Sequence, residues 1–233
     1  TPLADGFRSL PQLQEPETYY PLQVLICADC GLVQLGYVVP PEILFQRDYP
    51  YVSSTTETGK EHFHSLAKEA CRDFELKPDD LVIDIGSNVG VLLQGFINQG
   101  IKNALGIEPA ENICQMARAN GIETINEFFD EVSVSGIVAT KGKARLVTGT
   151  NVIAHIDNHH AMVRALDILL DRKGIFIFEA PYLVNLLDNL EYDTIYHEHL
   201  SYLSVQPMNR LFQQFGMEIF DVKTVSIHGG SLR

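Results

Sequence analysis

Four adjacent side chains near the end of the chain, Tyr196-His197-Glu198-His199, bring together groups that accept or donate protons. An imidazole titrates near neutral pH, and a neighbouring carboxylate can orient it or stabilise its charged form. The same groups can bind a metal ion, although histidines two positions apart share a face only in an extended strand. The spacing alone leaves three interpretations open: acid–base chemistry, a metal site, or a hydrogen-bonded structural cluster.

A second chemically capable segment is the CxxC of Cys27 and Cys30, which is followed by Gly31. Such a tight turn lets two thiolates face one cation, as in a zinc knuckle or ribbon. A structural zinc ion takes four ligands, and two are visible here. The alternatives are a redox pair and an empty half-site. We favour zinc, because the flanking β-rich sequence lacks the βαβ context of thioredoxin-like proteins.

The segment from Asp84 to Gly90 is typical of a strand-to-helix turn that approaches a ligand closely. Gly86 and Gly90 suit a turn in which the backbone must come near the ligand. The dinucleotide pattern needs glycine at its first, third and sixth positions, but Asn88 occupies the third, which disfavours a nicotinamide or flavin dinucleotide. A carboxylate at the strand end also suits a cationic ligand better than a pyrophosphate. The candidate binding residues of this turn are Asp84, Gly86, Ser87, Asn88 and Gly90.

The next expected strand ends in Glu108, one βαβ repeat after Asp84. A carboxylate at this position can accept hydrogen bonds from both hydroxyls of a ribose. The glycine turn together with the second-strand acid predicts a nucleoside-type ligand. The alternative is a structural turn with a surface glutamate.

The elements that must position these residues alternate from Leu81 onward, which predicts an α/β fold: a Rossmann-like, mostly parallel sheet with helices on both faces. Ligands bind outside the carboxyl ends of the strands in such sheets, which is where these motifs fall. The strands are expected at 81–85, 104–107, 123–128, 146–150 and 175–179, and the helices near 57–74, 89–99, 111–120 and 159–170.

Three parts are expected along the chain: a partial zinc-binding β appendage at 1–47, a linker loop and helix at 48–76, and a ligand-binding α/β domain at 77–233. The 233 residues are 45% hydrophobic, which suits one moderate core plus an appendage. No stretch is apolar enough to predict a membrane span or a signal peptide, so a cytoplasmic protein is expected. The excess of 30 acidic over 17 basic residues argues against nucleic acid as a partner.

Several motifs in one order resemble the class I S-adenosylmethionine (AdoMet) methyltransferases, through Asp84–Gly90 and Gly106–Ala110. More narrowly, the chain resembles the sugar C-methyltransferases that act on nucleotide-linked deoxy-ketosugars. The segments that carry this resemblance are 27–35, 49–54, 84–90, 106–110, 151–155, 196–199 and 228–233. In that family an earlier CxxC completes the zinc site, and another α/β domain follows the His-Gly-Gly-Ser segment, so the chain is expected to be a fragment.

The resemblance implies that a carbon next to a ketone is deprotonated and then methylated by AdoMet, with a nucleotide-linked ketosugar as partner. It makes His199 the candidate base, and the choice of His199 over His197 rests on the resemblance. Glu198 or Tyr196 would orient the sugar or stabilise the enolate oxygen. Tyr49 and Tyr51 would close over the same pocket.

Two further candidates have structural alternatives of nearly equal weight. Asn151 follows a predicted strand and could hold the cofactor or the acceptor, or could cap the next helix. Phe128 could stack on the adenine, although it and Phe129 could both be core rings. The competing functions are a class I O- or N-methyltransferase for another small molecule and a non-catalytic zinc-ribbon interaction protein.

Overall fold

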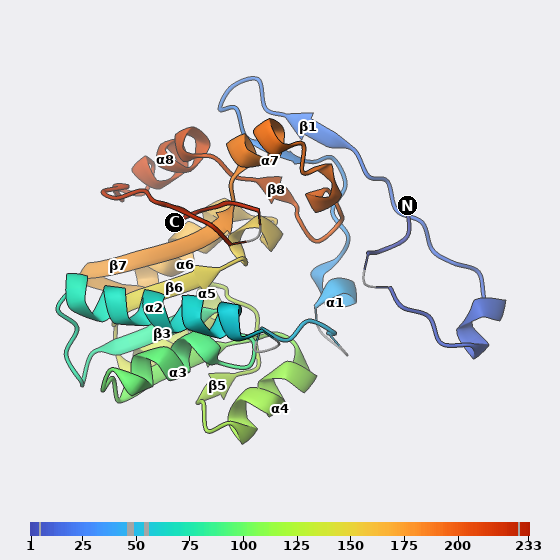
Figure 1. Cartoon of the computed structure of the whole chain (residues 1–233). Coiled ribbons are helices and arrows are strands. Elements are labelled where there is room, and N and C mark those ends of the chain that lie inside the picture. Colours follow the sequence, from blue (N-terminus) through green and yellow to red (C-terminus); the bar gives the residue numbers. More distant parts are fainter. Residues whose placement is uncertain (5, 46–48, 54–55, 228) are drawn as a thin grey trace. The chain divides into compact units, whose positions relative to one another are not determined.

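The computed structural model describes residues 1–4, 6–45, 49–53, 56–227 and 229–233. It divides into two compact units (Figure 1). The first unit contains residues 1–44, 154–157 and 180–233, and the second contains 45–153 and 158–179. The division therefore differs from the consecutive parts expected at 1–47, 48–76 and 77–233, because the chain returns to the first unit after leaving it.

The second unit is built on five parallel strands in the order β5-β4-β3-β6-β7. Their bounds are β3 (Leu81–Ile85), β4 (Asn103–Ile107), β5 (Thr124–Ile125), β6 (Ala144–Thr150) and β7 (Leu170–Pro181), whose last two residues belong to the first unit. The strand order reverses between β3 and β6. In open α/β sheets, ligands bind at the carboxyl ends of the strands at such a reversal. The Rossmann-like fold predicted from the sequence is confirmed.

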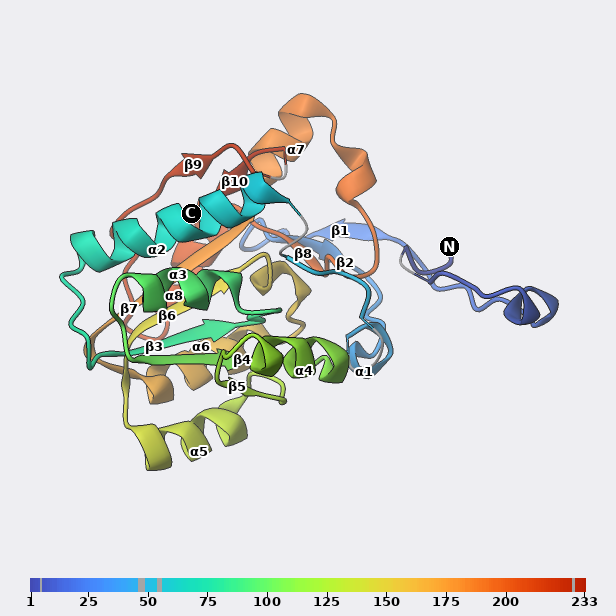
Figure 2. The ribbon, with the colours of Figure 1, turned by 60° about the horizontal axis from the view of Figure 1, so that its bottom comes forward.

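Helices cover both faces of this sheet, as Figure 2 shows for α2 and α3 on one side and α5 and α6 on the other. The second-unit helices are α2 (Glu57–Asp73), α3 (Val91–Asn98), α4 (Glu111–Ala119), α5 (Glu131–Lys141) and α6 (His159–Leu169). The apolar face of α2, with Phe63, Leu66 and Ala70, packs against Phe96 of α3 in the main core. This packing holds the polypeptide before α2 close to the turn that starts α3.

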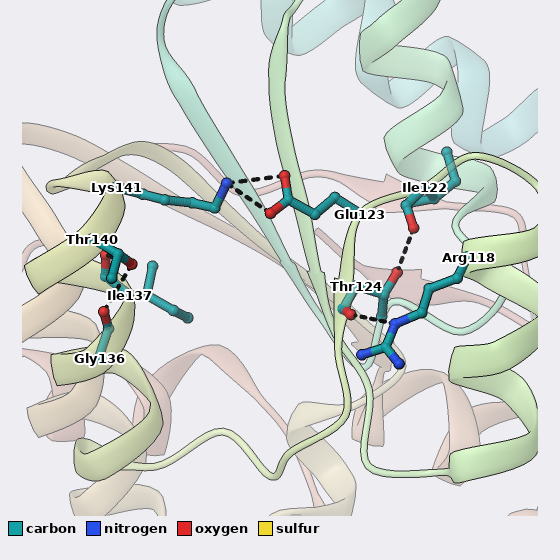
Figure 3. A network of polar contacts seen from close by, with 8 residues as sticks. All are labelled: Arg118, Ile122, Glu123, Thr124, Gly136, Ile137, Thr140 and Lys141. Carbon is teal, nitrogen blue, oxygen red and sulfur yellow. Dashed lines mark hydrogen bonds and ion pairs between the residues drawn. The ribbon is translucent and has the colours of Figure 1, made fainter.

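Helix α5 is not predicted by the sequence pattern, and β5 has two residues where a strand over 123–128 is expected. A capping box between Asp130 and Ser133 starts α5 instead. Figure 3 shows how polar contacts support the edge of the sheet there. Arg118 Nε donates to the carbonyl of Thr124 over 2.9 Å, and Lys141 lies 2.7 Å from Glu123. The exposed Lys141–Glu123 ion pair contributes about 0–1 kcal/mol. The short strand also pairs with its neighbour β4.

The first unit combines both ends of the chain around a three-stranded antiparallel sheet in the order β1-β2-β8. Val33 of β2 pairs with Tyr202 of β8, so a segment near residue 200 completes the sheet of the CxxC hairpin. A small core of Leu35, Leu186, Leu200 and Tyr202 lies behind it.

The strands of this unit are β1 (Val24–Ile26), β2 (Val33–Leu35), β8 (Ser201–Tyr202), β9 (Thr224–Val225) and β10 (Ser231–Leu232), and β10 also pairs with Ala180 and Pro181. Its helices are α1 (Pro41–Leu44), α7 (Leu183–Asn189) and α8 (Val205–Gln213), with 3-10 turns at Pro11–Gln14 (η1), Ile153–His155 (η2, shared with the second unit) and Tyr192–Thr194 (η3). Across the described residues, no helix has both the length and the apolar character needed to cross a membrane.

Candidate active-site residues

Two glycines shape the turn between β3 and α3. Gly86 and Gly90 have φ angles of +62° and +83°, a region that L side chains rarely adopt. A Cβ at Gly86 would lie 2.9 Å from a methyl of Val152, and one at Gly90 would lie 2.7 Å from the Ile122 side chain. Both positions therefore require glycine for conformation and for space, and the backbone of the turn stays uncovered by their side chains.

The carboxylate of Glu108 is held in a fixed orientation beside this turn. Its Oε2 accepts a hydrogen bond from the Asn88 N–H, and its Oε1 accepts one from the Ala110 N–H, both over 2.9 Å. Each carboxylate oxygen has a second lone pair, so the group can still accept from a diol. Glu108 is only 5% exposed, which excludes the surface glutamate considered from the sequence.

Asp84 is buried at the end of β3 and accepts a 2.7 Å hydrogen bond from the Thr148 hydroxyl. Burial raises the pKa of its carboxyl to about 7; the Thr148 hydrogen bond opposes this rise, and the charge of Glu108 adds to it. Two carboxyls in one buried site favour a cationic ligand, because a positive charge offsets the cost of burying both.

Asn88 connects the turn to the loop that precedes α2. Its Oδ1 accepts from the Ser53 N–H over 2.9 Å, and its Nδ2 donates to the Tyr51 carbonyl over 3.0 Å. Its φ of +50° is one that asparagine tolerates better than most residues. The loop is fastened again at Tyr49, whose N–H and C=O both bond the amide of Asn112. The structure therefore places Tyr49 and Tyr51 with the glycine turn, in the second unit.

Asn151 and Ser87 each carry a buried polar atom, Oδ1 and Oγ respectively, with no hydrogen-bond partner among the described residues. Asn151 has a φ of +56°, its unpaired Oδ1 caps neither η2 nor α6, and the cap of α6 is Asn158. The helix-cap alternative for Asn151 is therefore wrong. Unpaired buried polar atoms beside an open glycine turn fit a bound polar ligand, and the arrangement fits AdoMet. Phe128 lies partly buried in the loop between β5 and α5.

The proton-handling cluster belongs to the first unit and forms a turn, in which the His199 N–H donates to the Tyr196 carbonyl. His199 Nδ1 lies 2.8 Å from the Thr194 carbonyl, which can only accept, so Nδ1 carries a hydrogen. In the neutral ring Nε2 is then the acceptor, and the Tyr196 hydroxyl donates to it over 3.1 Å. The result is a directed chain from Tyr196 through His199 to Thr194.

The two histidines of the cluster have different surroundings. The ring of His197 is 2% exposed and meets Tyr20, and neither of its nitrogens has a hydrogen-bond partner among the described residues. His199 instead lies with its ring centroid 5.1 Å from that of His155. Glu198 stands between them in the sequence, and its side chain is buried, with 6% of the residue exposed. The turn separates the two imidazoles, and only His199 is part of the directed chain.

The structure adds His155 and Tyr202 to the residues around His199. Burial, with a contribution from His199, lowers the pKa of His155 far below its usual range, so its ring is neutral. Tyr202 and His199 line one small pocket, and burial raises the pKa of Tyr202 to about 12. His155 lies in the 3-10 turn η2, which follows Asn151. His159, at the start of α6, is buried, and its Nε2 lies 3.1 Å from the Ile153 carbonyl.

The CxxC forms a tight turn between β1 and β2, closed by a 2.9 Å hydrogen bond from Gly31 N–H to the Cys27 carbonyl. Backbone N–H groups of Cys30 and Asp29 lower the pKa of the Cys27 thiol, which favours the thiolate form that binds metals. Both thiols are free and partly exposed. Within the described ranges, no group of three or more His, Cys, Asp or Glu side chains is arranged to hold a metal ion. The turn thus brings two free thiols together.

Two family models match consecutive stretches of the chain. Residues 60–222 match the family model described as a methyltransferase domain. The chain belongs to the methyltransferase domain family. Residues 1–45 of this methyltransferase-family chain match a second model, described as a putative zinc binding domain. The family match and the geometry of the glycine turn together support AdoMet as its cofactor.

Among curated proteins, the C-methyltransferase NovU of Streptomyces niveus is 37% identical over 232 residues, which are 100% of this chain and 55% of NovU. The chain thus spans about half the length of this relative. Among solved structures, magnesium protoporphyrin IX methyltransferase from Synechocystis PCC 6803 with bound SAH is 19% identical, with a TM-score of 0.57 over 74% of this chain and 80% of that one. The Haloferax volcanii complex of the Trm112 activator with a putative methyltransferase is 14% identical, with a TM-score of 0.55 over 72% of this chain and 76% of that one. Both structures share the fold.

Proposed function

We propose that this chain is part of an AdoMet-dependent C-methyltransferase that methylates a carbon next to the ketone of a nucleotide-linked deoxysugar. The observation that carries the proposal is the directed chain Tyr196–His199–Thr194, which presents one basic nitrogen of known tautomer. A methyl transfer to oxygen or nitrogen uses a lone pair that already exists, whereas a transfer to carbon needs a base first. The similarity to a C-methyltransferase supports the same reaction type.

The proton leaves the carbon toward the Tyr196–His199 pair. His199 Nε2 is the proton acceptor, and the hydrogen bond from Nδ1 to the Thr194 carbonyl stabilises the imidazolium that forms. Tyr196 occupies the acceptor nitrogen in the free protein, so its hydroxyl either moves aside or passes the proton on. In both cases the proton ends on His199, which makes the two residues one functional pair.

The other predicted residues take supporting roles in this proposal. Glu198 orients the sugar or the base from its buried position. Tyr51 and Tyr49 lie on the loop fastened to the glycine turn, and partial burial raises the pKa of Tyr51, so its phenol remains a hydrogen-bond donor at neutral pH. Phe128 stacks on the adenine.

The second unit binds the methyl donor. Glu108 accepts from the ribose hydroxyls, Asp84 faces the positive charge, and Gly86 and Gly90 leave the backbone accessible. The buried amide oxygen of Asn151 and hydroxyl of Ser87 gain partners from the ligand. When bound, AdoMet supplies an electrophilic methyl group. Cys27 and Cys30 supply two ligands of a structural zinc ion in the first unit.

Solvent-deuterium exchange tests the proposal directly. The protein is incubated in deuterium oxide with a nucleoside diphosphate-linked ketodeoxyhexose and S-adenosylhomocysteine, and incorporation next to the ketone is followed by NMR. Exchange should occur, and His199→Asn should slow it by roughly 10²-fold while AdoMet affinity stays within a few-fold. His160→Gln, at an exposed position of α6, is the matched control and should exchange normally.

Two outcomes would contradict the proposal. Absence of exchange in the unaltered protein, with turnover on a hydroxyl or amine substrate, would make it an O- or N-methyltransferase. Absence of AdoMet binding by calorimetry in the folded full-length protein would leave only the non-catalytic interaction protein.

A further inference from the structure

The hydroxyl of Tyr202 is a buried donor without a hydrogen-bond partner among the described residues. Its ring packs with Leu35, Leu186 and Leu200 in the core of the first unit, and the residue is 5% exposed. A buried hydroxyl that forms no hydrogen bond costs stability, whereas a phenylalanine ring would fill the same space at no such cost. The tyrosine is therefore unfavourable for folding alone, which suggests a use outside the free protein.

The position of this residue indicates what that use is. Tyr202 lines a small pocket together with His199, Thr194 and Ser201, and the pocket has room for about one water-sized group. Pro181 and Leu183 form apolar parts of its wall. A pocket of this size and lining suits a single oxygen atom of a larger ligand. Tyr202 and His199, the proposed base, therefore border the same small space.

A tyrosine at this position could act as a hydrogen-bond donor or as a base, and the protonation state of its phenol decides between the two. Burial raises the pKa of Tyr202 to about 12, so the hydroxyl keeps its proton at neutral pH. Tyr196 differs, because its hydroxyl is already engaged with His199. Tyr202 is thus a hydrogen-bond donor and not a second base.

We propose that the Tyr202 hydroxyl donates a hydrogen bond to the ketone oxygen of the acceptor and stabilises the negative charge that develops there. This inference rests on the proposed function, and it assigns Tyr202 as a further catalytic residue. A hydrogen-bond donor that is already in place in a largely apolar site does not have to reorganise when the charge develops. Donors of this kind stabilise a developing charge more than donors in water do.

The proton on the carbon moves to His199, and the electron pair of that C–H bond moves into the enolate, whose oxygen accepts the Tyr202 hydrogen bond. The enolate carbon then bonds the methyl group of the donor; the C–S electron pair stays on sulfur, and the ketone forms again. Tyr202 keeps its proton throughout, and His199 releases its proton to solvent.

Tyr202→Phe tests the inference, with deuterium exchange, steady-state kinetics and thermal unfolding measured on the full-length protein. Exchange into the ketodeoxyhexose probe and kcat should both fall by roughly 10²-fold, with KM within a few-fold. The Tm should stay the same or rise, because the variant removes an unpaired buried hydroxyl. Tyr37→Phe, a partly exposed phenol of the same unit, is the control and should change none of these values.

The possible failures are distinguishable. If the unaltered protein exchanges deuterium and Tyr202→Phe exchanges within about threefold of it, the assignment of Tyr202 is wrong while the proposed function stands. A lower Tm of Tyr202→Phe would also overturn it, because the hydroxyl would then have a structural partner. If the unaltered protein shows no exchange, the proposed function itself fails.

Discussion

The backbone N–H of Ser53 donates a 2.9 Å hydrogen bond to the side-chain oxygen of Asn88, so the loop before α2 is attached to the glycine turn. The same amide donates to the Tyr51 carbonyl, and the Asn88 N–H bonds Glu108. One residue therefore links the loop that carries Tyr51 to the carboxylate proposed to bind the ribose. Placement of Tyr51 and binding of the cofactor should depend on each other.

Asn88→Asp should weaken AdoMet binding by roughly tenfold and lower the Tm, because the new carboxylate cannot donate to the Tyr51 carbonyl and adds charge beside Glu108. Calorimetry and thermal unfolding measure the two effects. Asn98→Asp, at the exposed end of α3, is the control. Unchanged affinity and unchanged Tm in Asn88→Asp would show that the loop and the turn are independent.

AdoMet affinity should rise with pH through about 7, because burial raises the pKa of Asp84 to that value and only its charged form attracts a cation. The stability of the free protein changes in the opposite direction. It falls as the pH rises from 3.8 toward 7, because the unfolded chain loses the Asp84 proton before the folded protein does. Thr148→Val removes the hydrogen bond that favours the carboxylate, so the midpoint of the affinity curve should move to higher pH. Calorimetric titrations across this range measure it, and an identical midpoint in both proteins would count against the role of Asp84.

The contribution of His155 to stability should fall as the pH drops below 6.5, in the direction opposite to that of Asp84. Burial and the neighbouring His199 lower the pKa of His155 in the folded state, so the unfolded chain takes up a proton there first. His155→Gln should make the decline of unfolding free energy between about pH 7 and pH 5 shallower, by at most about 1.4 kcal/mol per pH unit. Chemical denaturation at several pH values tests this, with the exposed His160→Gln as control. Parallel curves for His155→Gln and the unaltered protein would contradict it.

A buried contact between α2 and β7 should contribute more to stability than the exposed ion pairs do. His62 Nε2 lies 2.7 Å from Oε2 of Glu179, and the Glu179 side chain is fully buried. Glu179→Gln should cost about 2 kcal/mol, because a hydrogen bond to a charged group is replaced by a weaker one. Glu61→Gln on the exposed face of α2 is the matched control. A Glu179→Gln variant that unfolds at the same denaturant concentration as the control would disprove this.

Local pattern was enough to predict the sheet of the second unit. The apolar run at Leu81–Ile85 is β3 with the bounds expected, and α2 begins at Glu57 as its apolar spacing indicates. Helix α5 escaped prediction because its first turn mixes serine and valine and its signal is the capping box at Asp130. That box was the one local clue.

Some residues of the candidate site could also be predicted from local pattern, and others could not. Gly86 and Glu108 could be predicted because a turn and its second-strand acid have a fixed phase along the chain. The pairing of Tyr196 with His199 depends on a turn that alternating periodicity does not encode. Tyr202 is a candidate because its hydroxyl oxygen is buried without a hydrogen-bond partner among the described residues. That burial depends on packing against residues distant in the sequence, which local pattern does not show.

The pairing of β2 with β8 has a consequence for how this protein can be divided or recombined. The strand that begins two residues after His199 has the hairpin of Cys27 and Cys30 as its neighbour in the sheet. Removal of the first 44 residues would expose the backbone of β8. It would also remove Leu35 from the small core and so expose the apolar residues that pack against it. Chimeras with related enzymes should therefore exchange the cysteine hairpin and the segment from 180 onward together, because the two share one sheet and one core.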